Sequence, residues 1–241
     1  MGTMAESLAL GKRFGRYYQS RNGREMHSLG NRAPSLEFGS DAAAYTGPNP
    51  ETGKRIIHIG LGLFDKYHDG TDVWDNEAEW HTQMRYLIGH EQGHNYFTTQ
   101  RAWIDAQKQG FENLVRYALQ QVTGRQMRLT KEEDYEKALA MLRDQYHVPI
   151  NTDAVKKLVH FVCNSIEDGR EERKMCRKFP GFAMDMKFCR GKYWMHTEMQ
   201  EDVDVKSPRE HVLCVLNQVL SLATTGYLQK GFIKYAAGTV V

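Results

Sequence analysis

Cysteine is scarce in this chain and is not arranged for metal binding. Only 4 cysteines occur among the 241 residues, and no two of them form a Cys-x-x-Cys pair, so a structural zinc site built on cysteine is not expected. A chain of this length with so few cysteines is also not a disulfide scaffold. Reduced thiols in a cytoplasm fit this composition best.

Long apolar runs and an excess of one charge are also missing. No stretch approaches about 20 consecutive apolar residues, so no transmembrane helix is expected. Residues 1–18 contain no apolar segment of signal-peptide length. With 32 basic and 30 acidic residues the formal net charge is +2, which gives no reason to expect nucleic acid as the main partner. The 41% hydrophobic content is enough to bury a sizeable core in one domain, with or without a helical appendage.

The strands are expected in the first part of the chain. Residues 1–34 are basic, polar and rich in glycine, which indicates a loop with one amphipathic helix at 8–18. A short strand is expected within 35–46, followed by a turn at 47–50. Apolar side chains alternate through 55–64, which predicts a half-buried strand.

Helices are expected in the rest of the chain, so the order of elements is typical of an α+β fold. They are predicted either from apolar residues at three- and four-residue steps or from capping patterns. The predicted helices cover 77–100, 103–121, 152–178 and 207–225. A further helix is predicted to begin at Thr130, with Glu133 as its capping partner. Residues 179–206 are expected to be irregular.

One pentapeptide, His90-Glu91-Gln92-Gly93-His94, matches the His-Glu-x-x-His pattern. Residues four apart lie on one face of a helix, so both imidazoles can reach one metal ion. Glu91 is then placed to hold and deprotonate a water molecule at the metal. A chain of this composition would contain about 0.03 accidental copies of the pattern, so its context has to support it. Gly93 would either admit a closely packed backbone or be a tolerated helix glycine costing about 1 kcal/mol.

A catalytic zinc ion usually has three protein ligands and an open position for water, so a third ligand is needed. The pattern with a third histidine fails, because Gln100 occupies that position and Phe97 replaces the expected glycine. The other pattern takes a glutamate from a later helix. The best candidate is Glu167, which follows an apolar helical stretch, and the alternative for Glu167 is an exposed carboxylate paired with a nearby arginine.

Other residues are candidates for supporting roles. Glu171 lies one helical turn beyond Glu167 and could accept the free N–H of a ligating histidine, fixing its tautomer. Asp168 and Glu172 compete for this role. The candidates for stabilising an oxyanion are Tyr193, His196, His211 and Arg170.

The sequence His90-Glu91-x-x-His94 followed by Asn164-x-x-Glu167-Asp168-x-Arg170 resembles the metallopeptidase domains of phages and mobile elements that often precede a von Willebrand factor A domain. These domains are gluzincin-like, with a motif helix and a glutamate helix, as in the small minigluzincin peptidases. The resemblance covers roughly residues 40–175 and is specific at the two helices. It implies zinc ligation by His90, His94 and Glu167, with Glu91 as general base. The chain lacks room for a downstream A domain, so it would be a fragment or a stand-alone member.

The sequence therefore predicts a zincin-like α+β fold, in which a small N-terminal mixed sheet precedes an active-site helix, a glutamate helix and additional helices. Residues 1–34 would be an N-terminal extension, 35–178 the metallopeptidase core, and 179–241 a C-terminal loop and helical part of the same domain. The expected activity is hydrolysis of peptide bonds in a protein or peptide substrate, with one Zn²⁺ ion and no membrane partner. The expected location is a cytoplasm, that of a bacterial host included, or a virion.

Two other classes of protein remain open. The first is an inactive or structural zincin-like protein, such as a phage assembly or particle component. The second is a metal-binding regulatory module that needs a partner protein or a missing downstream domain. The chain keeps Glu91 and all three ligand candidates, which argues against lost activity.

Overall fold

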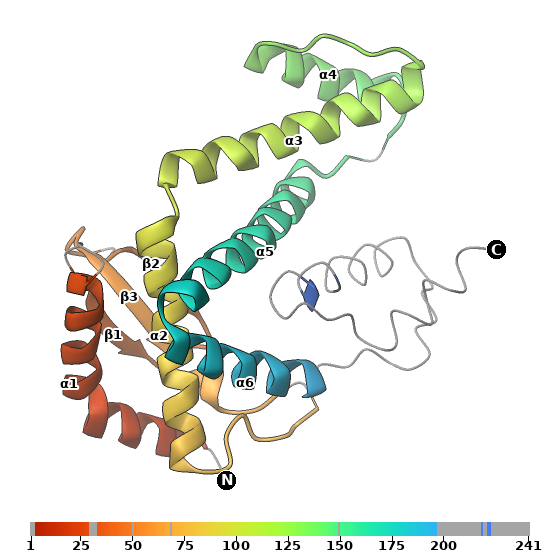
Figure 1. Ribbon diagram of the computed structural model, residues 1–241. Coiled ribbons are helices and arrows are strands. Elements are labelled where there is room, and N and C mark those ends of the chain that lie inside the picture. The colour runs from red at the N-terminus through yellow and green to blue at the C-terminus, as the bar shows by residue number, and fades with distance from the viewer. Residues whose placement is uncertain are drawn as a thin grey trace. The chain divides into compact units, whose positions relative to one another are not determined.

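The computed structural model describes residues 3–28, 33–49, 51–67, 69–148, 150–196, 218 and 221–222. Within them the chain combines helices with a small mixed sheet, so the α+β prediction is confirmed (Figure 1). The helices are α1 (Met4–Ser28), α2 (Glu77–Phe97), α3 (Gln100–Thr123), α4 (Glu132–Asp144), α5 (Thr152–Lys178) and α6 (Pro180–His196). The chain divides into two compact units, the first made of Met1–Phe97 with Asp168–Val241 and the second of Thr98–Glu167.

The first unit contains a three-stranded sheet in the order β1-β3-β2. Its strands are β1 (Ser35–Gly39), β2 (Ala44–Pro48) and β3 (Arg55–Gly60). β1 pairs with β3 in parallel and β2 pairs with β3 in antiparallel orientation. The sheet is therefore mixed, as predicted, and β2 lies at one edge of it.

The strand predictions were wrong in two details. The segment 35–46 holds one whole strand and the start of a second, and the latter continues into the expected turn at 47–50. The strand expected at 55–64 stops at Gly60 and is followed by the 3₁₀ helix η1 (Leu61–Phe64). The chain leaves the sheet at this point, where the N–H of Gly62 donates to the carbonyl of Asp41 before β2 (2.8 Å), a contact between residues that are distant in the sequence.

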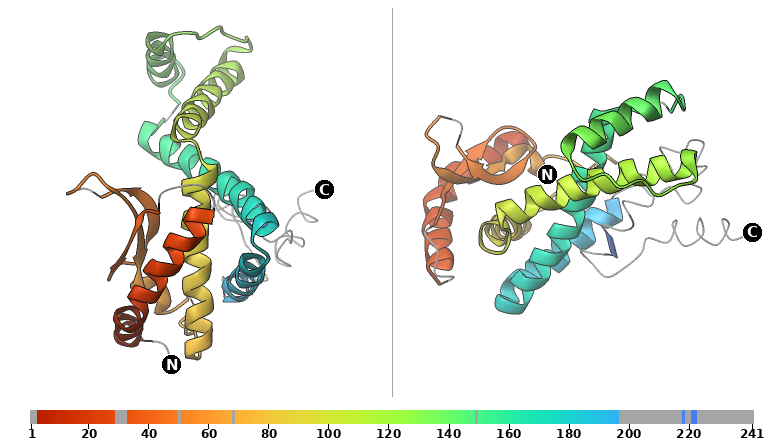
Figure 2. Two further views of the ribbon diagram at one scale, coloured as in Figure 1. Left: turned by 60° about the vertical axis from the view of Figure 1, so that its left-hand side comes forward. Right: turned by 90° about the horizontal axis from the view of Figure 1, so that it is seen from above.

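One face of the sheet carries the main hydrophobic core. The alternating residues Ile57 and Ile59 of β3 are fully buried and pack in one cluster with side chains of α1 and α2. The buried members from the two helices are Tyr18, Trp80, Met84 and Ile88. Helices α1 and α2 therefore cover the same face of the sheet (Figures 1 and 2), which fixes the rotation of α2 about its own axis.

Helix α1 is longer than the sequence predicted, because the expected loop beyond residue 18 is helical through Ser28. Buried contacts account for this difference. Met26 is 1% exposed, and the side chain of Asn22 donates to the carbonyl of Pro34 (2.8 Å) and accepts from Gln92 of α2 (2.7 Å). Tertiary packing thus outweighs the low helix propensity of Gly23 in this segment.

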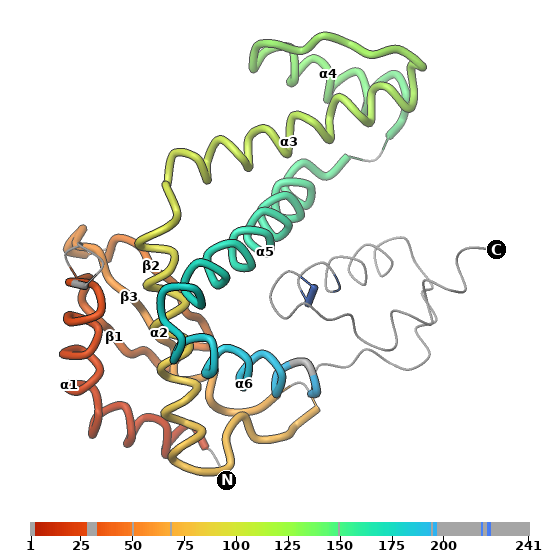
Figure 3. Tube along the Cα trace, in the orientation of Figure 1, coloured from red at the N-terminus to blue at the C-terminus, as the bar shows by residue number. Residues whose placement is uncertain are grey.

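The sequence predicted an irregular segment at 179–206. This prediction was wrong for residues 180–196, which form helix α6 (Figure 3). The residue before a proline is disfavoured in the α conformation, so α5 ends at Lys178. Pro180 is well suited to the first position of a new helix. Phe182 and Cys189 of α6 are buried with Tyr86 of α2 and Met175 of α5 in a second core cluster. The helix expected at 207–225 lies for the most part outside the described residues.

The second unit is helical and has its own core. Its elements are α3, α4 and residues 152–167 of α5. Val115, Leu119, Tyr135 and Leu142 are among its buried residues. Helix α3 ends at Thr123 and is followed by Gly124, which has the left-handed conformation (φ +67°) typical of a helix C-terminus.

The capping prediction for the fourth helix was wrong by one residue. The N–H groups of Thr130 and Lys131 both donate to Asp134 at 3.0 Å, so Asp134 and not Glu133 is the capping carboxylate. No helix among the described residues is long and apolar enough to cross a membrane.

Candidate metal centre

Helix α2 carries the His-Glu-x-x-His pattern, as predicted. The amide N–H of Glu79 donates to the side chain of Asn76 (3.1 Å), a usual way to start a helix. Because the buried residues of its first turns face the sheet, His90 and His94 project from another side of the helix. There they meet residues 168–172 of α5, which belong to the same unit.

Three ligand atoms converge between α2 and this part of α5. Nε2 of His94 lies 3.2 Å from Nε2 of His90. Oδ1 of Asp168 lies 3.2 Å from Nε2 of His94 and 3.8 Å from Nε2 of His90. The side chains are mostly buried, with exposed fractions between 11% and 16%. His90, His94 and Asp168 therefore form a group that could hold a metal ion.

These separations suit a small tetrahedral ion. Two ligand atoms that are each about 2.0–2.1 Å from such an ion stand about 3.4 Å apart. The three separations here lie on both sides of that value. Two imidazoles and a carboxylate are also a donor set that zinc accepts in catalytic sites.

The other nitrogen of His90 faces two buried carboxylates. Nδ1 lies 2.9 Å from Oε1 of Glu171 and 3.0 Å from Oε1 of Glu172. A carboxylate next to Nδ1 favours the tautomer with hydrogen on Nδ1, which leaves the lone pair of Nε2 for a metal. The sequence predicted that Glu171 accepts the free N–H of a ligating histidine. Both Glu171 and Glu172 lie close enough to Nδ1 of His90 for this role. His90, Glu171 and Glu172 also make up a second group with ligand atoms close together.

Burial and neighbouring charges act together on the carboxyl groups. Burial raises the pKa of Glu171 to about 7, although His90 beside it acts in the opposite direction. Burial also acts to raise the pKa of Glu172, but Arg190 and His90 outweigh it and hold that pKa at about 2. Glu91 is 4% exposed, and its burial raises its pKa against the pull of the two histidines.

The imidazoles are basic in the metal-free site. Burial acts to lower the pKa of His90, but Glu171 and Glu172 outweigh it and raise that pKa well above its ordinary value. For His94 the hydrogen bond to Asp168 likewise outweighs burial and raises the pKa. Protons and a metal ion therefore compete for both rings, and a metal would be released as the pH falls.

Gly93 is needed for the close approach of α5 to α2. A Cβ atom at Gly93 would stand 1.6 Å from Oε2 of Glu171 and 3.0 Å from Met175. The expected close packing is confirmed, but the partner is the side chain of Glu171 and not a backbone. This carboxylate is fully buried. Its Oε1 faces Nδ1 of His90, while its Oε2 has no hydrogen-bond partner among the described residues.

We expect Gly93→Ala to destabilise the fold by about 3 kcal/mol, because the new methyl group overpacks a buried contact. Gly23→Ala in α1 is the matched control, since nothing lies within 4 Å of its added Cβ; it should stabilise by about 0.5–1 kcal/mol. Urea denaturation of both variants measures the two effects. Equal stabilities would show that Gly93 is not in close contact.

Glu167, the third ligand implied by the resemblance, belongs to neither group of ligand atoms. Its carboxylate accepts a hydrogen bond from the hydroxyl of Thr98. Asp168, the next residue along the helix, is the carboxylate that approaches both Nε2 atoms. The sequence had assigned Asp168 only to a supporting role.

The oxyanion candidates lie in different places. Arg170 donates to the carbonyl of Phe97 at the end of α2 (2.8 Å). Tyr193 packs edge-on against Tyr67. His196 stacks on the same ring and its Nδ1 lies 2.8 Å from Asp69. His211 lies outside the described residues, so an oxyanion donor remains a prediction.

One link between the motif helix and the edge strand was not anticipated. Asn95, the residue after His94, donates from its side chain to the hydroxyl of Thr46 in β2. Thr46 in turn donates to the carbonyl of Ile56 in β3 (3.1 Å). The edge strand is thereby held beside the end of α2 that carries the histidines.

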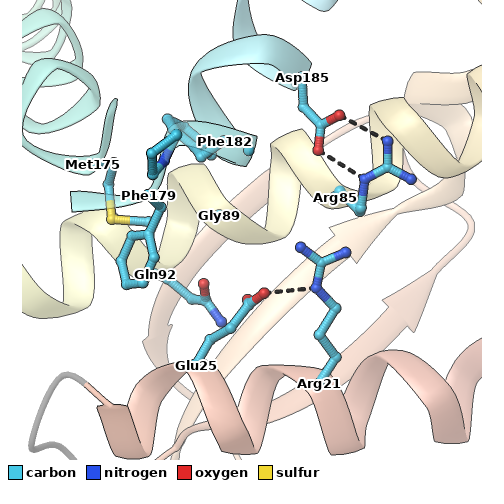
Figure 4. A pocket seen from close by; sticks show the side chains of 11 residues that line it. Arg21, Glu25, Arg85, Gly89, Gln92, Met175, Phe179, Phe182 and Asp185 are labelled. Atoms are coloured by element: carbon cyan, nitrogen blue, oxygen red, sulfur yellow. Dashed lines mark hydrogen bonds and ion pairs between the residues drawn. The ribbon is translucent and has the colours of Figure 1, made fainter. Parts of the chain in front are cut away.

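A separate cavity of about 220 Å³ lies between α1, α2 and the start of α6 (Figure 4). Both guanidinium groups that line it are already paired, Arg21 with Glu25 and Arg85 with Asp185. Neither motif histidine lines it. The cavity is therefore distinct from the metal centre.

No model of a known protein family, no curated protein and no solved structure matches this chain. The function therefore has to be argued from the chemistry of the site.

Proposed function

We propose that this protein is a zinc-dependent peptidase in which His90, His94 and Asp168 hold one Zn²⁺ ion and Glu91 is the general base. The observation that carries the proposal is the convergence of two Nε2 atoms and one carboxylate oxygen within 3.8 Å of one another. Glu171 and Glu172 support it, because they lie at Nδ1 of His90 where an orienting carboxylate is needed.

In this proposal Glu91 carries the proton. When bound, zinc supplies a Lewis acid that polarises the scissile carbonyl and acidifies a water molecule. Glu91 takes a proton from the water and returns it to the leaving amine. Its burial raises its pKa, which makes it a stronger base than an exposed glutamate, although the positive charge of zinc would act against this.

The edge strand β2 favours a peptide as the substrate. An extended peptide can add to a free strand edge through backbone hydrogen bonds. Asn95 and Thr46 tie this strand to the motif helix next to His94. A peptide paired with β2 would therefore run beside the metal centre.

Metal analysis of the purified protein, together with digestion of a broad peptide library, tests the proposal. We expect about one zinc ion per chain and cleavage that a chelator stops. Zinc without cleavage would favour the structural or regulatory protein described above, and absence of bound zinc after incubation with the metal would overturn the proposed site.

A further inference from the structure

We propose that Arg190 of α6 is a positioning residue that acts on His90 through Glu172. The proposal rests on the proposed function, since it concerns the histidine assigned to the metal. It adds a third helix to the site, because the ligands and Glu172 come from α2 and α5 alone.

One oxygen of Glu172 is surrounded by three donors from two other helices, α2 and α6. The hydroxyl of Tyr86 donates to Oε1 of Glu172 (2.7 Å) and so does Nη2 of Arg190 (2.8 Å). Nδ1 of His90 lies 3.0 Å from the same oxygen. This oxygen therefore stands at a fixed point from which it can accept the Nδ1–H of His90.

The neighbouring carboxylate is not fixed in the same way. Oε1 of Glu171 is as near to Nδ1 of His90, at 2.9 Å. However, apart from this contact with His90, neither oxygen of Glu171 has a hydrogen-bond partner in the described part of the chain. Of the two carboxylates, Glu172 is thus the one whose orientation is set by other side chains.

Arg190 is itself firmly placed. Its side chain is 15% exposed, and its guanidinium carbon lies 5.5 Å from the centre of the Tyr86 ring. Glu172 is 1% exposed, so loss of Arg190 would leave its buried negative charge without its cationic partner. The carboxylate would then relax, and His90 would lose its fixed acceptor.

The direction in which loss of Arg190 changes the zinc affinity distinguishes a positioning role of Arg190 from a purely electrostatic one. Removing a cation near the site would by electrostatics alone strengthen the binding of Zn²⁺. Loss of an orienting partner instead weakens metal binding, by about 10–100-fold in known sites. A positioning role therefore predicts a change of the opposite sign to a purely electrostatic one.

The control for a merely structural role is a second ion pair made by α6, in this case with α2. Arg85 of α2 donates twice to Asp185 of α6, at 2.7 Å each (Figure 4). It is partly buried, and its side-chain hydrogen bonds go to Asp185 and to Thr82 of its own helix. Arg85→Met should thus weaken the contact of α6 with α2 without disturbing Glu172.

The experiment compares Arg190→Met, Arg190→Lys and Arg85→Met with the unchanged protein. Zinc affinity is measured by competition with a chelator, and the tautomer of His90 in the metal-free protein is measured by ¹⁵N NMR at a pH high enough for the imidazole to be neutral, because its pKa is raised. We expect about 10-fold weaker zinc binding in Arg190→Met, partial recovery in Arg190→Lys, and little change in Arg85→Met. The signal of Nδ1–H in His90 should weaken only in Arg190→Met.

Unchanged or tighter zinc binding in Arg190→Met would overturn the proposal, and so would an equal loss in Arg85→Met. If the unchanged protein binds no zinc, the proposed function fails. The tautomer of His90 then still decides the inference, because it is read without metal.

Discussion

Glu91→Gln should lower the rate of peptide cleavage by about 10³-fold, within the range found for loss of a general base, while bound zinc stays in place. Glutamine has the same shape and fills the same buried position, but it cannot take up a proton. Glu91 is not one of the residues whose ligand atoms converge, so the metal centre should remain intact. Initial rates with a peptide found in the library screen, and zinc content of the same samples, measure the two effects.

Glu77→Gln is the matched control for this prediction. It makes the same substitution on the same helix at a position whose side chain is 49% exposed. Its cleavage rate should stay close to that of the unchanged protein. Retained cleavage in Glu91→Gln would remove Glu91 from the mechanism, and loss of zinc in that variant would show that it acts through metal binding instead.

Asp168→Ala should weaken zinc binding by more than about 100-fold, because loss of a direct ligand exceeds the 10–100-fold effect of an outer partner. The neighbouring variant Glu167→Ala should bind zinc within about 3-fold of the unchanged protein, well below that effect. Oδ1 of Asp168 lies 3.2 Å from Nε2 of His94, whereas the carboxylate of Glu167 accepts from Thr98. Competition with a chelator gives both affinities.

These two variants together show which of the two candidates, Glu167 or Asp168, is the third zinc ligand. If Glu167→Ala loses zinc and Asp168→Ala keeps it, the ligand implied by the resemblance is correct and our assignment is wrong. Thermal denaturation of both metal-free variants should accompany the measurement, so that a loss of zinc is not confused with a loss of fold.

Much of the site could be predicted from local sequence patterns. The spacing of His90 and His94 is sufficient to place both rings on one side of a helix, because helix geometry depends only on nearby residues. The apolar repeats of α2 and α5 predicted both helices close to their observed limits. The alternation at Ile57 and Ile59 likewise predicted the buried strand β3.

Elements held by distant contacts could not be predicted in this way. The second half of α1 and the whole of α6 contain glycines and lack a clear local signal. Residues of both segments contact helices that are far away in the sequence: Asn22 accepts a hydrogen bond from Gln92 of α2, and Phe182 packs in one cluster with Tyr86 of α2. The role of Arg190 could not be predicted from the sequence for the same reason, since it depends on the contacts of Arg190 with Glu172 and Tyr86.

Local patterns in the sequence are sufficient to predict the motif helix, the later helix with its acidic residues and the α+β order of elements. Which acidic residue meets the histidines depends instead on how the helices pack. Adjacent residues on a helix point about 100° apart, so the choice between Glu167 and Asp168 depends on the rotation of α5 about its axis. That rotation is set by the packing of Glu171 and Met175 against Gly93, a contact between helices that no local pattern contains.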